Sequence, residues 1–105
     1  MKAIFIPIDG PVRLIDLRDA EHLRTFMECQ EVSRLTIDVD HDVYLPKVVL
    51  ETVENRNLRA TTACALGQTL HGPALFIGHD QAGRWQDVEP RIIELVARLP
   101  EPQKV

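Results

Sequence analysis

The chain has little of what marks disulfide-linked or membrane-spanning proteins. Its two cysteines, Cys29 and Cys64, are too few for a disulfide framework in 105 residues. No apolar run approaches the roughly 20 residues that a bilayer-spanning helix needs. Only 5% of the residues are aromatic, so the core of a folded domain must consist mainly of aliphatic side chains.

The first residues of the sequence also predict no secretory signal. An apolar run follows Lys2, but Pro7, Asp9 and Gly10 end it before it is long enough for the apolar region of such a signal. Thiols stay free in the reducing cytosol. The sequence therefore predicts a cytoplasmic protein whose two cysteines are small core residues rather than nucleophiles.

Positive charge is scarce and dispersed. Twelve Lys and Arg residues are outnumbered by sixteen Asp and Glu residues, which gives a formal net charge of −4. Binding to a nucleic-acid duplex needs basic side chains clustered on one face. The basic residues here are interleaved with acidic ones, so the sequence predicts binding neither to nucleic acid nor to a membrane.

The apolar residues that are present follow strand and helix periods. The clearest pattern has a period of two, with Leu35, Ile37, Val39, Val43 and Leu45 on one parity. The predicted strands and helices lie, in chain order, at 2–8 and 12–17 (strands), 20–30 (helix), 35–45 (strands with a turn or bend at 40–42), 47–52 (an extension of the sheet), 58–66 (helix), 74–77 and about 85 (strands), and 90–99 (helix).

Capping residues divide these segments. Asp19, Asn57 and either Asp87 or Glu89 are predicted to cap the three helices, and Pro90 suits a first helical turn. The order of elements predicts one α+β domain over residues 1–100, with a mostly antiparallel sheet and two or three helices packed on one face. Residues 101–105 are predicted to form a flexible C-terminal tail.

Acidic residues around His41 form the first candidate site. Alternating carboxylates on a strand share one face, so Asp38, Asp40 and Asp42 together with His41 resemble the ligands of a divalent cation. The pattern of a calcium-binding loop is absent. A solvated strand face and turn explains the same residues without a metal.

A second candidate set lies further along the chain. His71, His79 and Asp80, with Cys64, are residue types that bind zinc, and a histidine beside an aspartate is typical of a general base. No metal-ligand spacing or placed nucleophile accompanies them. An aspartate in a turn is also favoured for hydrogen bonds to the backbone. These residues carry the alternative hypothesis of a small metal-binding or enzymatic protein.

No cofactor is predicted. Gly67, Gly72 and Gly78 do not form the glycine-rich loop that cradles a phosphate, and no lysine follows in the required position. We interpret these glycines as turn residues around a strand.

The best candidate for a binding surface is aromatic. Trp85 is the only tryptophan, and Arg84 precedes it on a predicted edge strand. Tryptophan and arginine are enriched at binding hot spots. Tyr44 falls on the polar parity of its strand, so an exposed face that held Tyr44, Arg84 and Trp85 would be a site for a protein partner. Packing of Trp85 over the rim of the core is the structural alternative.

The chain contains several short motifs in a fixed order. They are Met1-Lys2-Ala3-Ile4 with Asp9-Gly10, Asn57-x-x-Ala60-Thr61, and Gly72-Pro73-Ala74-Leu75-x-x-Gly78 followed by Asp80, Gly83 and Asp87. In these motifs the chain resembles a small domain family of unknown function that is common in actinobacterial phages, plasmids and other mobile elements.

The resemblance implies a fold and a genomic setting, and no catalytic residues. Small proteins in such genomes often bind a host protein to redirect it or to block a defence system. The hypothesis that follows is a non-enzymatic protein that binds a host protein in the host cytoplasm. A homodimer through a free strand edge remains open beside it.

Overall fold

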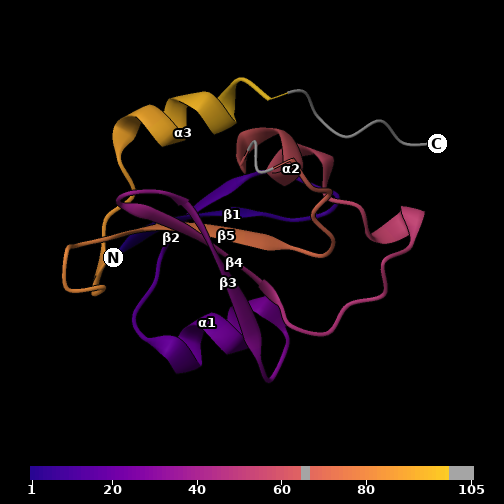
Figure 1. Ribbon diagram of the computed structural model, residues 1–105, viewed down its shortest axis with the longest axis horizontal. Helices are drawn as coiled ribbons and strands as arrows, with labels where there is room; N and C mark the ends of the chain where they lie inside the picture. The colour runs from indigo at the N-terminus through magenta and orange to yellow at the C-terminus, as the bar shows by residue number, and fades with distance from the viewer. Residues whose placement is uncertain (65–66, 100–105) are drawn as a thin grey trace.

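The computed structural model describes residues 1–64 and 67–99 (Figure 1). The strands are β1 (Lys2–Ile6), β2 (Arg13–Asp16), β3 (Val32–Asp38), β4 (His41–Pro46), β5 (Ala74–His79) and β6 (Trp85–Gln86). The helices are α1 (Ala20–Met27), α2 (Leu58–Cys64), α3 (Pro90–Ala97) and a 3₁₀ turn, η1 (Val53–Asn55). The strands form one antiparallel sheet in the order β2-β1-β5-β4-β3, with β6 beside the end of β5.

Helices cover both faces of this sheet. In Figure 1, α1 lies below the sheet, and α2 and α3 lie above it. The predicted α+β class and antiparallel sheet are confirmed. Two helices share one face, as predicted, and the third occupies the opposite face. No described helix has the length and apolar character that crossing a membrane requires.

The strands at the centre carry apolar side chains on both faces. From β1 and β5, Ile4, Ile6 and Phe76 pack against α2 and α3. Ala3 and Leu75, one residue out of phase, pack against α1. A strand covered on both sides reads as a continuous apolar run, which is why these segments stood out in the sequence.

The turn between β3 and β4 differs from the prediction. It lies at residues 39–40, before the predicted 40–42, and the strand register shifts between Thr36 and Asp38. Val39, predicted to share the core parity, sits in this turn and is 90% exposed. The other four residues of this parity, Leu35, Ile37, Val43 and Leu45, share one core cluster as predicted, so only the turn residue departs from the pattern.

Other boundaries moved by a few residues. Strand β1 ends at Ile6, α1 ends at Met27 where Glu28 takes a left-handed conformation, and the predicted sheet extension at 47–52 is not a strand. Asp19 caps α1 by accepting from His22 N, and α3 starts at Pro90 after Glu89. The predictions for 65–66, Pro100 and the tail lie outside the described residues.

Gly78→Ala is expected to detach β6 and to lower the free energy of unfolding by roughly 1–3 kcal/mol. A Cβ at Gly78 would lie 2.8 Å from Asp87 O and 3.1 Å from Gln86 O, so the backbone of β6 must move away. Urea denaturation followed by the fluorescence of Trp85, the single tryptophan on β6, measures the effect. An unchanged emission spectrum and midpoint would contradict this close approach.

Candidate functional site

His41 is a fully buried histidine at the start of β4. Its Nδ1 lies 3.1 Å from Asp38 Oδ1 and 3.0 Å from Asp40 Oδ1. Its Nε2 accepts a hydrogen bond of 3.3 Å from the backbone N–H of Glu89, ahead of α3. We assign the ring proton to Nδ1, because Nε2 must be free to accept. His41 therefore joins the β3–β4 turn to the start of α3.

The positive charge of Arg91 lies beside the carboxylates that surround His41, in the place that a bound metal ion would take. Its guanidinium is 3.1 Å from Asp38 Oδ2, 3.7 Å from Asp40 Oδ1 and 2.6 Å from Glu89 Oε2. Asp38, Asp40 and His41 present ligand atoms within 4.8 Å of one another, the one such group of three among the described residues. This part of the predicted metal set comes together, but Arg91 already compensates its charge.

The pKa values of the acidic groups reflect these contacts. Burial alone would raise the pKa of Asp38, but hydrogen bonds with Asp40, Arg91 and His41 outweigh it and hold that pKa well below its ordinary value. The carboxylates of Asp38 and Glu89 raise the pKa of Asp40. The hydrogen bond from Arg91 lowers the pKa of Glu89.

Arg91→Met is expected to destabilise the protein slightly at neutral pH and much less near pH 2. Asp38 and Glu89 have folded pKa values below their unfolded ones, so they contribute stability above the ordinary carboxyl pKa. That contribution is lost as the pH falls through the lowered values. The neutral-pH effect is small because Arg91 is 58% exposed.

Thermal denaturation of both proteins at the two pH values measures this difference. Asp40, with its raised pKa, contributes in the opposite sense, so the two proteins are compared with each other at each pH. A difference in midpoint that is the same at both pH values would contradict the ion-pair account.

Asp42 and His79 form a second pair on the opposite face of the sheet. His79 Nδ1 lies 2.9 Å from Asp42 Oδ2, and His79 Nε2 lies 3.0 Å from Val39 O. Because a carbonyl oxygen only accepts, Nε2 is the donor in the second contact. Asp42 is 3% exposed, and neither its Oδ1 nor His79 Nδ1 has a hydrogen-bond partner among the described residues. The pair holds the β3–β4 turn from this face.

The structure does not bring the second predicted set together. His71 lies before β5 and forms an isolated bridge with Arg56, whereas His79 is the last residue of β5. Asp80 accepts from the N–H groups of Ala82 and Arg84 in its own turn.

The cysteines fit the structural interpretation. Cys64 belongs to the core, and burial raises the pKa of its thiol to about 12. Cys29 is half-buried beyond the end of α1, not within the helix as predicted, and burial raises the pKa of its thiol too. A raised pKa removes the reactive thiolate.

Tyr44 and Trp85 meet on the α1 side of the sheet. Trp85 Nε1 donates a 3.1 Å hydrogen bond to Tyr44 Oη, and the two rings pack edge to face with centroids 6.0 Å apart. Both side chains are half-buried and pack against the core between α1 and the sheet. We call these two residues, with Arg34 directly opposite Tyr44 on β3, the Tyr44–Trp85 surface.

Arg84 is less closely tied to this surface. Its side chain is 81% exposed, and its Nε lies 3.1 Å from Asp80 Oδ2 within the β5–β6 turn. The predicted aromatic pair is therefore brought together, whereas Arg84 is held toward its own turn.

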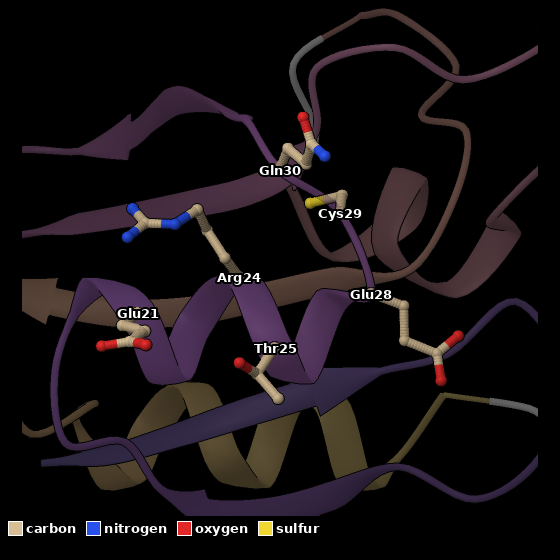
Figure 2. Close-up of a pocket in the computed structure, with 6 residues that line it drawn as sticks. All are labelled: Glu21, Arg24, Thr25, Glu28, Cys29 and Gln30. Carbon is tan, nitrogen blue, oxygen red and sulfur yellow. The ribbon is translucent and has the colours of Figure 1, made fainter.

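The surface has two other features, a hollow beside α1 and a stretch of exposed aliphatic side chains. A hollow of about 530 Å³ beside α1 is lined by Glu21, Arg24, Thr25, Glu28, Cys29 and Gln30, and in Figure 2 the Glu28 side chain points away from Arg24 and Gln30. It is open to solvent. Residues 48–58 expose four aliphatic side chains: Val48 (88%), Leu50 (74%), Val53 (69%) and Leu58 (64%). Neither feature includes an aromatic residue.

Comparison with known proteins adds no functional information. No protein-family model matches the chain, and no curated protein or solved structure is significantly similar to it. The resemblance to the mobile-element family therefore stays a prediction from the sequence.

Proposed function

We propose that the protein acts by binding another protein through the Tyr44–Trp85 surface, without catalysing a reaction. The observation that carries this proposal is the pairing of Tyr44 with Trp85, which holds two half-buried aromatic side chains together on one sheet face. Large aromatic groups with a polar end are the commonest anchors of protein interfaces. Their mutual hydrogen bond fixes both rings before a partner arrives, which lowers the entropy lost on binding.

The engagement of the ionisable groups also supports binding over catalysis. Both ring nitrogens of His41 have structural partners. His79 Nε2 donates to Val39 O, whereas His79 Nδ1 lies 2.9 Å from Asp42 Oδ2 without making a hydrogen bond. Asp80 is saturated by its own turn. A general base needs a free position beside its substrate, and the contacts of His41 and Asp80 use the positions that these two side chains have.

The class of partner follows from the resemblance rather than from the structure. A family of phage and plasmid proteins implies a partner from the host cell, and a role in modulating or blocking that partner in its cytoplasm.

Capture from bacterial lysate with tagged protein as bait tests the proposal. We expect one stoichiometric partner, retained by wild type and Leu95→Ala and lost by Trp85→Ala. Leu95 is a suitable control because it is 46% exposed on α3, across the sheet from Trp85. Equal retention by all three baits would contradict a Trp85-centred site. Stoichiometric metal in the purified protein would instead favour the metal-binding alternative.

A further inference from the structure

Strand β3 forms a free edge of the sheet beside the proposed site. Among the described residues it pairs only with β4, and its register is regular from Val32 to Thr36. This stretch has no proline, and the register shift comes only after it. Such an edge offers unpaired backbone donors and acceptors to another strand.

The two faces of β3 differ in chemistry. Leu35 lies opposite Val43 on β4. Leu35 and Ile37 are half-buried and pack at the border of the core between the sheet and helices α2 and α3. On the α1 face, Arg34 lies opposite Tyr44 and is exposed. Arg34 makes no ion pair with any described residue. The edge therefore presents Leu35 and Ile37 on one face. On the other face it presents the exposed Arg34 beside the Tyr44 ring, with Val32 packed half-buried two residues earlier.

We infer that this edge receives an extended segment of the partner in which apolar and acidic residues alternate. Residues directly opposite in neighbouring strands share a face, so apolar side chains of the added strand would cover Leu35 and Ile37. Its acidic side chains would face Arg34. Backbone hydrogen bonds supply affinity in this mode, and the alternation supplies specificity. The inference rests on the proposed function and names the partner segment for the same site.

A second copy of the chain fits this edge less well. In antiparallel pairing centred on Leu35, Arg34 would face Thr36 of the other copy. The acid nearest on the strand, Asp38, lies after the register shift and opposite His41, where it contacts His41 and Arg91 on the other face. A copy of β3 thus brings no carboxylate to Arg34, whereas an acidic segment does.

Three synthetic ten-residue peptides test the inference by fluorescence anisotropy. One alternates valine and glutamate, one alternates valine and lysine, and one holds the valines and glutamates in two blocks. We expect the first to bind about tenfold more tightly than either of the others, because only it matches both faces. Arg34→Glu should reverse the preference between glutamate and lysine. Arg13→Glu, on the opposite edge strand β2, should leave it unchanged.

Either of two results would overturn the inference. One is equal binding of the three peptides. The other is sedimentation of the free protein as a dimer that Leu35→Lys dissociates, which would place a second copy on this edge.

The captured partner separates this inference from the proposed function. Loss of the partner with Trp85→Ala but not with Arg34→Glu would refute the strand-edge inference alone. Retention with both variants would refute both.

Discussion

Asn57→Ala is expected to lower the free energy of unfolding by about 3–5 kcal/mol, a large part of the 5–15 kcal/mol typical of a domain. Asn57 is fully buried at the start of α2. Its Nδ2 donates to Ile6 O at 2.8 Å and to Gly72 O at 2.9 Å, and its Oδ1 accepts from Ala60 N at 3.1 Å. One side chain thus joins β1, the segment before β5 and the first turn of α2.

Alanine would leave those three buried backbone groups without the side-chain bonds that satisfy them. Each such group destabilises a protein by about 1–3 kcal/mol. Asn55→Ala is the matched control, because Asn55 is half-buried and its side chain makes one hydrogen bond, to Leu50 O. Chemical denaturation of the three proteins measures the difference. Equal midpoints for Asn57→Ala and wild type would show that this junction is not what anchors α2.

Trp85→Ala is expected to weaken partner binding at least about 30-fold, the effect of removing a hot-spot side chain. The substitution removes the indole ring and also leaves Tyr44 Oη without its donor. Trp85→Phe keeps an aromatic ring but loses the N–H, so we expect an intermediate effect. Titration calorimetry with the captured partner gives the three affinities.

A double-mutant cycle separates the hydrogen bond from the ring contacts. Tyr44→Phe removes the acceptor alone, and it should have little further effect once Trp85 is phenylalanine. Circular dichroism must show that each variant is folded. Strictly additive effects of the two substitutions would mean that the Tyr44–Trp85 hydrogen bond does not prearrange the surface.

Local features of the sequence predicted much of the fold. The caps at Asp19 and Asn57 and the continuous apolar runs of β1 and β5 predicted elements that the structure confirms. These features depend on residues near in sequence, so a pattern reveals them. The position of α1 on the opposite face depends on how distant segments pack, which no local pattern encodes.

The candidate site was predictable only in part. The polar parity of Tyr44 and the aromatic character of Trp85 marked both residues, but their contact depends on strands β4, β5 and β6 pairing in one register. His41 shares the parity of Val43 and Leu45, a signal of burial that the acidic residues around it obscured. The register shift between Thr36 and Asp38 places the Asp38 carboxylate beside His41, and it depends on how β3 pairs with β4 rather than on a local residue pattern.

Hydrogen–deuterium exchange of the protein with and without its captured partner tests the central claim most directly. The account predicts slower exchange of the backbone amides of β3, β4 and β6, which surround Tyr44 and Trp85. Exchange in residues 48–58 and in α3 should not change, although both expose aliphatic side chains. Protection confined to 48–58 or α3, with β3, β4 and β6 unaffected, would contradict the Tyr44–Trp85 surface as the binding site.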